Sequence, residues 1–269
     1  MANTVYPNKV IEAKAKDILT TQINARSMMT IDTSLTQNAG MVKTINTYTY
    51  TGTAEEVSAG SGNSTRGSIA YVGKDYTVKM VQQAFDYLDE DFMKDPVIVD
   101  FGIKGATSVM TNKMTSDFYA ALATKGSGST ELVTGITFAK GKALSYDVIV
   151  DAISELNLED ESKIFIVIPN AWKASLRKDA DYKSAQMGEV IYNGQVGTVC
   201  GIPVIASKAL TTKAYVMTKE AVKLFMKKDV EVEQDRNADT RKNSVYLRTA
   251  YIVALEHADK ICEISEANA

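Results

Sequence analysis

The residue types that most often carry enzyme chemistry are scarce and scattered in this chain. It has one histidine, His257, and two cysteines, Cys200 and Cys262, that lie far apart in the sequence. Zinc sites and Cys-His dyads bring such side chains together, and no spacing here indicates that. We interpret His257, between Glu256 and Asp259, as a polar turn residue rather than a general base or metal ligand. The cysteines fit two buried thiols of a reducing compartment.

The segment GITFAKGKA, residues 135–143, superficially resembles a phosphate-binding loop. Five residues separate Gly135 from Gly141, and Ala143 stands where the magnesium-binding hydroxyl would be needed. We therefore interpret this segment as a loop before a helix.

Two groups of carboxylates are the other candidates for acid-base chemistry. The first group comprises Asp86, Asp89, Glu90 and Asp91, and the second comprises Asp229, Glu231, Glu233 and Asp235. We interpret the first group as a solvated helix face and the second as one charged face of a strand. Basic residues follow the second group at Arg236, Arg241, Lys242 and Arg248. Such interleaved charges favour contacts between copies of the chain, because complementary charges fix orientation and register.

These observations predict a chain with no catalytic residue, no cofactor and no metal site. The 269 residues are 45% hydrophobic, enough for the core of one large domain or two closely packed ones. The net charge of −3 lacks the basic surface that sequence-independent nucleic-acid binding requires. No apolar run is long enough for a signal peptide or a membrane span, so we expect synthesis in the cytoplasm.

The elements around these residues begin with an arm and a long hairpin. Residues 9–29 predict an arm with one short helix, whose apolar stripe comprises Val10, Ala13, Ile18 and Leu19. Residues 41–53 and 68–80 are rich in Thr, Tyr, Val and Ile, and they predict two strands on either side of a soft, polar tip, SAGSGNSTRGS. Neither face of this ribbon is apolar enough to sit firmly on a core. The ribbon would project about 40 Å. Because an isolated ribbon is marginally stable, we expect a neighbouring subunit to complete it.

The rest of the chain predicts a spine helix, an α/β lobe and closing strands. Residues 81–93 have helical spacing that should end at Pro96, where a longer helix begins. That second helix has a single apolar seam and should stop near residues 125–129; the seam comprises Ile103, Ala106, Met110, Met114, Phe118 and Ala121. Alternating helices and strands predict a compact lobe over residues 141–215, and the last part of the chain returns to strands.

This order of parts resembles the major capsid proteins of tailed bacteriophages with the Hong Kong 97 type fold, over nearly the whole chain. The residues that carry the likeness most are GQVGTVCGIPVIAS (194–207), with its Gly-Ile-Pro-Val run, and the closing strands of residues 214–264. The resemblance implies an α+β fold with an N-terminal arm, an extended β-hairpin loop, a spine helix, a peripheral domain and an axial domain. It divides the chain into an arm at 1–40, the extended loop at 41–80, a peripheral domain at 81–140 and 216–269, and an axial domain at 141–215.

The implied function is structural: self-assembly through pentamers and hexamers into an icosahedral head shell that encloses the double-stranded DNA genome. The residues expected at subunit interfaces are Tyr48, Tyr50, Arg66, Tyr71, Lys74, Tyr76, Glu231, Glu233, Arg236 and Arg248. Because the arm is short, a separate scaffolding protein is an expected partner, together with a portal and non-specific contact with packaged DNA. The expected location is the virion, after synthesis in the host cytoplasm. The alternative is an encapsulin-like nanocompartment shell that encloses a cargo enzyme.

Overall fold

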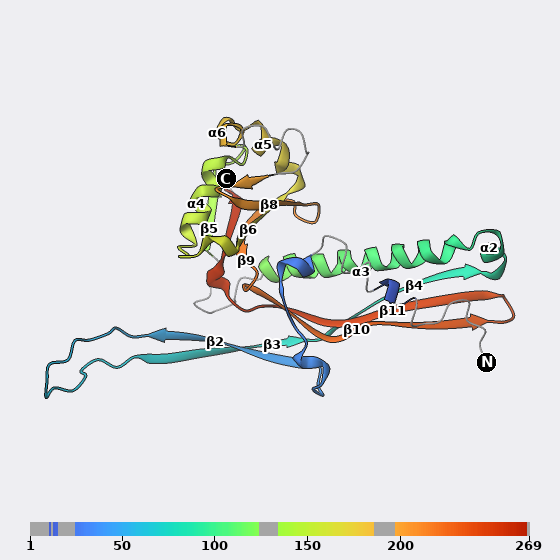
Figure 1. The fold of residues 1–269 in the computed structure, drawn as a ribbon, viewed down its shortest axis with the longest axis horizontal. Helices are drawn as coiled ribbons and strands as arrows, with labels where there is room; N and C mark the ends of the chain where they lie inside the picture. The colour runs from blue at the N-terminus through green and yellow to red at the C-terminus, as the bar shows by residue number, and fades with distance from the viewer. Residues whose placement is uncertain (1–10, 12, 16–24, 124–133, 186–196, 268–269) are drawn as a thin grey trace.

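A computed structural model describes residues 11, 13–15, 25–123, 134–185 and 197–267 (Figure 1). The described chain forms a long two-stranded hairpin, a four-stranded sheet beneath a long helix, and a lobe built on a six-stranded sheet. The hairpin projects away from the other two parts as a separate ribbon. The predicted stop of the spine helix at 125–129 lies outside the described residues.

The hairpin consists of β2 (Val42–Thr51) and β3 (Ser68–Thr77), and both predicted strands are confirmed. They pair antiparallel in unbroken register from Val42 opposite Thr77 to Thr51 opposite Ser68. The abundance of threonine, tyrosine and β-branched residues favours this extended backbone. Ten paired residues in each strand make the ribbon long enough to reach well beyond the body of the subunit.

The prediction of a helix at residues 81–93 is wrong for most of its length. Lys79–Leu88 form strand β4, and only Asp89–Lys94 are helical, as α2. Strand β4 pairs antiparallel with β11 along its whole length, and Val81, Phe85 and Tyr87 turn towards the core. A spacing of four residues, as between Val81 and Phe85, satisfies a strand period of two as well as a helix, and the pairing with β11 decides between them.

The long helix α3 (Val97–Ala123) begins directly after Pro96, as predicted, and its apolar seam is confirmed. Five of the six predicted seam residues are buried, while Ala121 is half-buried. The seam packs on a sheet of order β1-β10-β11-β4, formed by Thr30–Asp32, Val222–Asn237, Lys242–Leu255 and β4. Gly102 allows a close approach here, because a Cβ atom at this position would overlap the ring of Phe85 on β4.

Part of the N-terminal arm also lies on the helix α3. Residues 11 and 13–15 are helical, with Ile11 and Ala15 buried in the same cluster as Ile103. Ala13, predicted to face the core, is exposed, because the buried positions are offset from it by two residues. The other residues of the predicted stripe lie outside the described part of the chain.

The lobe contains a mixed sheet of order β5-β12-β9-β6-β8-β7. These strands are Thr134–Phe138, Ile261–Glu266, Lys213–Thr218, Ile164–Pro169, Ile202–Ser207 and Thr198–Val199. The lobe also contains helices α4 (Tyr146–Glu155), α5 (Lys173–Lys178) and α6 (Ala180–Ala185), and short 3-10 turns occur both in the lobe and outside it. Those turns are η1 (Ala25–Met28), η2 (Ser34–Thr36), η3 (Glu161–Lys163), η4 (Asn170–Trp172) and η5 (Ala258–Lys260).

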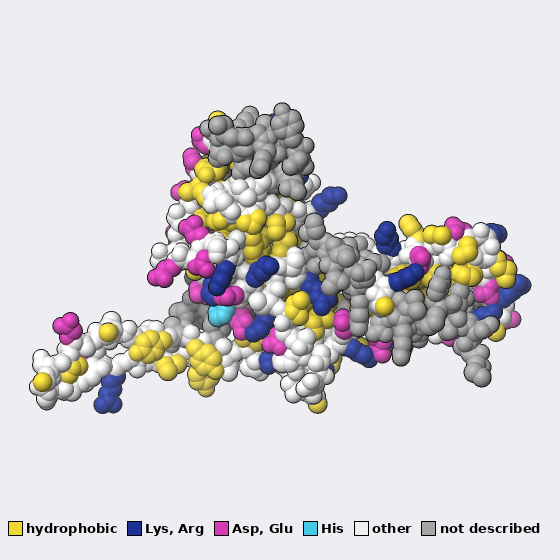
Figure 2. Space-filling model, viewed as in Figure 1, with side chains coloured by type: hydrophobic (Ala, Val, Ile, Leu, Met, Phe, Trp, Pro, Cys, Tyr) yellow, Lys and Arg dark blue, Asp and Glu magenta, His cyan; other side chains and the backbone are white. Residues whose placement is uncertain are grey.

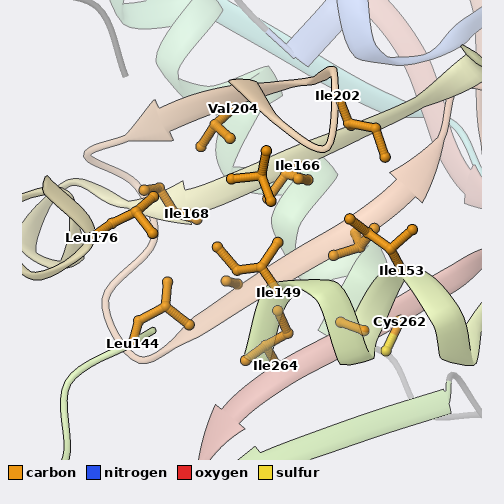
Figure 3. Packing of buried hydrophobic residues seen from close by; sticks show 14 of the residues in the cluster. Leu144, Ile149, Ile153, Ile166, Ile168, Leu176, Ile202, Val204, Cys262 and Ile264 are labelled. Atoms are coloured by element: carbon orange, nitrogen blue, oxygen red, sulfur yellow. The ribbon is translucent and has the colours of Figure 1, made fainter. Parts of the chain in front are cut away.

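The core of the lobe lies between α4 and the sheet (Figure 3). All six residues of β6 are buried, which confirms the prediction of a short buried strand there. Ser145 caps α4 by accepting a hydrogen bond from the backbone N–H of Val148, and Ile149 and Ile153 turn the apolar side of that helix into the core.

The expected boundary of the lobe at residues 141–215 needs correction. Strand β12, near the C-terminus, is part of the lobe's sheet, where it lies between β9 and β5. Strand β5, before residue 141, belongs there too. The chain therefore leaves the lobe after β9, forms β10 and β11 in the other sheet, and returns. The apolar residues of β12 would suit a place in either sheet, so their sequence cannot specify which one they join.

Candidate subunit interface

An exposed aromatic face covers the distal half of the hairpin. The register pairs Tyr48 with Tyr71 and Tyr50 with Ile69, which places all four side chains on the same side of the ribbon. They are 67%, 69%, 68% and 71% exposed, respectively. We call these four residues the aromatic face, and Figure 2 shows hydrophobic side chains on the surface of the ribbon. Neighbouring exposed apolar side chains of this size mark an interaction surface.

Two of the tyrosines of this face contact each other, and the third packs on the backbone. The ring centroids of Tyr48 and Tyr71 lie 6.2 Å apart. The phenol of Tyr50 covers Gly52 and Gly67, where a Cβ atom on either residue would overlap it. The absence of side chains at these two glycines therefore allows the Tyr50 ring to lie on the backbone where the strands end. The aromatic face is thus present in the single chain.

The base of the hairpin is anchored on its own subunit, which corrects the expectation that the ribbon lacks any core. Ile45 and Val78 are buried against Phe225 and Ile252, on the sheet face opposite α3. Tyr76 packs against the same cluster, and its hydroxyl donates a hydrogen bond to the carbonyl oxygen of Leu255 over 3.2 Å. The ribbon is thus attached at its base and unsupported beyond it.

The tip of the hairpin is more ordered than its composition predicts. The Glu55 carboxylate accepts hydrogen bonds from the backbone N–H groups of Ser64 and Thr65, over 2.8 and 3.0 Å. It also accepts hydrogen bonds from the side-chain hydroxyl groups of Ser64 and Thr65, over 2.6 and 3.1 Å. These bonds, led by the Ser64 hydroxyl, lower the pKa of Glu55 to about 2. Gly60, with φ of +89°, completes a turn closed by Ser61 N–H and Ser58 C=O.

Four of the charged residues predicted at an interface have ion-pair partners within this chain: Glu231, Glu233, Arg236 and Arg248. Arg248 lies 2.8 Å from the Glu233 carboxylate and donates to the Gln82 side chain over 2.6 Å. The Glu231 carboxylate lies 2.6 Å from the Lys228 ammonium. The predicted alternation is confirmed, since Glu231 and Glu233 lie on the sheet face opposite the buried Val230 and Val232. Contact between these charges and another copy stays a prediction.

The first carboxylate group forms a ladder of ion pairs at one end of the sheet. Asp86 lies on β4, not on a helix as predicted, 2.6 Å from the Lys242 ammonium. Asp89 lies 2.7 Å from the Arg236 guanidinium and accepts a hydrogen bond from the Asn243 side chain. The hydrogen bonds from Lys242 and from Arg236 lower the pKa values of Asp86 and Asp89, respectively. Both carboxylates therefore join the end of β4 to the neighbouring strands.

Asp117 on α3 is 5% exposed and connects this helix to strands β4 and β11 of the sheet. Its carboxylate lies 2.9 Å from Lys79, the first residue of β4, and 3.1 Å from Lys113 on the same helix. The Tyr251 hydroxyl of β11 donates to the other carboxylate oxygen over 2.9 Å. Burial raises the pKa of Asp117, but these hydrogen bonds outweigh burial, so the net shift is downward. Periodicity gave no sign of this cluster, because its members come from three elements.

The remaining candidates for chemistry are His257 and the two free cysteines. His257 precedes the short turn η5, with its imidazole 4.0 Å from the Asp259 carboxylate, as expected of a polar turn residue. Cys262 is buried, and burial raises its pKa to about 11, but Cys200 is exposed in the turn between β7 and β8, against the prediction of two buried thiols. Among the described residues, no three His, Cys, Asp or Glu side chains gather as a metal site would need. No helix within them is long and apolar enough to cross a membrane.

Several solved structures with this fold are phage capsids, and one is a virus-like particle from Pyrococcus furiosus, which matches with a TM-score of 0.65 at 10% identity over 96% of this chain and 98% of that one. No family model and no curated protein matches the sequence. The capsid of cyanophage P-SCSP1u matches with a TM-score of 0.69 at 13% identity, covering 90% of this chain and 87% of that one. The capsid of a native GTA particle matches with a TM-score of 0.67 at 12% identity, covering 100% of this chain and 94% of that one. The mature capsid of bacteriophage PhiM1 matches with a TM-score of 0.66 at 13% identity, covering 91% of this chain and 87% of that one.

These similarities confirm the resemblance to phage major capsid proteins at the level of the fold, and the mixed α+β class with it. They cover 90% to 100% of this chain and 87% to 94% of each capsid chain. The roles of individual parts as arm, peripheral domain and axial domain stay predictions.

Proposed function

We propose that this chain is a shell subunit of a phage capsid, with a structural and non-enzymatic role. Many copies would associate through pentamers and hexamers into an icosahedral shell that encloses double-stranded DNA. The observation that carries the proposal is the aromatic face, which projects on an anchored ribbon in a chain with a capsid fold. Such a face is covered only when another molecule lies against it.

The arrangement suits repeated contacts between identical subunits. Since the aromatic face lies beyond the anchored base of the hairpin and is exposed in the single chain, it is available to a neighbour. A contact between two different surfaces of identical chains is head-to-tail, and such contacts close into rings when the rotation allows it. In this proposal the helix-covered sheet acts as the peripheral domain and the lobe as the axial domain.

The charge of the chain fits a container better than a DNA reader. A net charge of −3 with both signs interspersed allows non-specific contact with packaged DNA and no tight grip on it. A separate scaffolding protein and a portal are further proposed partners, and the virion is the proposed location. No feature of the described residues favours a compartment that encloses a cargo enzyme.

Particle mass tests the proposal directly. A shell of sixty copies of the 29.3 kDa chain, the smallest icosahedral shell, has a mass of about 1.8 MDa. We expect the purified protein, alone or expressed with the scaffolding protein of its phage, to form rings and closed shells. Analytical ultracentrifugation and electron microscopy would detect them. A protein that stays monomeric at high concentration in both settings contradicts the proposal.

A further inference from the structure

We infer that Glu55 is a positioning residue that orders the hairpin tip in the free subunit, so that the tip meets a second copy of this chain in its binding conformation. The inference rests on the proposed function, because it takes that second copy as the partner. It adds a named residue and a sequence of events: the tip is formed first and binds afterwards.

The first step concerns what the tip would do without Glu55. Residues 52–67 connect the two strands, and the stretch SAGSGNSTRGS has no large apolar side chain that could pack. Glycine and serine in such numbers make a chain segment flexible. Local hydrogen bonds are therefore the means by which this tip can hold one shape.

The second step concerns the strength and position of those bonds. The four hydrogen bonds to Glu55 join it to Ser64 and Thr65, which lie nine and ten residues further along the chain. One side chain thus connects the outgoing and the returning half of the tip. Hydrogen bonds to an ionised carboxylate are stronger than those between neutral groups. Because the pKa of Glu55 is about 2, this acceptor stays ionised under all physiological conditions.

The third step concerns the partner. The tip continues directly from the aromatic face, since the Tyr50 phenol lies over Gly52 and Gly67 where the strands end. A second copy that covers Tyr48 and Tyr50 therefore lies next to the tip. Binding that must order a flexible segment is weaker than binding by a segment already in place. A tip held by Glu55 removes much of that cost at every one of the repeated contacts in a shell.

The test compares Glu55→Ala with Glu56→Ala, a matched control that removes the neighbouring exposed glutamate. In the unassembled subunit, amide hydrogen exchange should show protection at Ser64 and Thr65. We expect Glu55→Ala to speed exchange at these two amides at least about tenfold, and Glu56→Ala to leave it unchanged. The concentration at which particles appear should rise about tenfold for Glu55→Ala, because the tip must then be ordered on contact. Its thermal unfolding should match that of the wild type, since residues 52–67 of the tip are all exposed.

Each outcome decides something different. Ser64 and Thr65 amides that exchange at unprotected rates in the wild type would overturn the inference. It would equally fall if Glu55→Ala loosened the tip but assembled at the wild-type concentration; the shell function would then still stand. A wild-type protein with a protected tip and no assembly would overturn both the inference and the proposed function.

Discussion

Replacing Tyr48 and Tyr71 together with serine should abolish shell assembly while leaving the free subunit folded. Both rings are exposed on the distal hairpin and contact each other, but neither packs on the body of the subunit. Tyrosines at the centre of an interface typically contribute about 2 kcal/mol or more each. The loss recurs at every copy of the contact. Exposed substitutions of this kind change stability by about 0.5 kcal/mol or less.

The matched control lies on the other side of the same ribbon. Ala70 and Val72 are exposed and alternate with Tyr71, so replacing both with serine changes the opposite face. Sedimentation and thermal unfolding of the two double variants separate assembly from folding. We expect the control to form particles and the tyrosine variant to stay small, with melting temperatures close to that of the wild type. Assembly by the tyrosine variant at wild-type concentration would show that the aromatic face is not the contact.

Replacing Asp117 with alanine should have the largest effect on the stability of the free subunit, about 2–3 kcal/mol. The change leaves the buried Tyr251 hydroxyl without its acceptor and removes the shared partner of Lys79 and Lys113. Both lysines are more than half exposed, so water offsets part of their loss. A loss of this size lowers the melting temperature by about 5–10 °C in a chain of this length.

A pH series on Asp117→Asn identifies the charge as the cause. Hydrogen bonds from Lys79, Tyr251 and Lys113 lower the pKa of folded Asp117 despite its burial, while the unfolded value is about 3.9. The carboxylate therefore stabilises the fold above pH 4, and this contribution is lost as the pH falls through the folded pKa. We expect wild-type stability to fall more steeply below pH 4 than that of the variant.

The control for this series is Asp100→Asn, which removes a carboxylate from the same helix at an exposed ion pair with Lys14. Its stability should stay within about 0.5 kcal/mol of the wild type, and its pH profile should follow the wild-type profile. Equal acid sensitivity in Asp117→Asn and the wild type would contradict the proposed role of the Asp117 charge.

The sequence predicts the parts of this fold whose local signal is unambiguous. The seam of α3 follows a helical period, the two hairpin strands follow from β-prone composition, the buried strand β6 follows from an apolar run, and all are confirmed. The prediction of a helix over strand β4 is wrong because the four-residue spacing of Val81 and Phe85 fits both a helix and a strand. The pairing with β11 decides in favour of the strand. The expected boundary of the lobe is wrong because the sheet that β12 joins depends on strands that are distant in the sequence.

The candidate interface was predictable only in part, for a related reason. Tyr48, Tyr50 and Tyr71 were predicted at an interface from the sequence, and strand alternation places Tyr48 and Tyr50 on one side of the ribbon. Ile69 completes the face through its pairing with Tyr50, which requires the register of the hairpin. The order that Glu55 imposes on the tip depends on side-chain hydrogen bonds across nine residues, and no periodic pattern signals such bonds.

The most direct test of the central claim is an electron-microscopy reconstruction of the assembled particle at a resolution that shows side chains. We predict that the aromatic face of each hairpin lies against a neighbouring copy and that Tyr48, Tyr50, Ile69 and Tyr71 are buried there. A complete shell in which these four side chains are still exposed to solvent, or contact only their own subunit, would contradict the account.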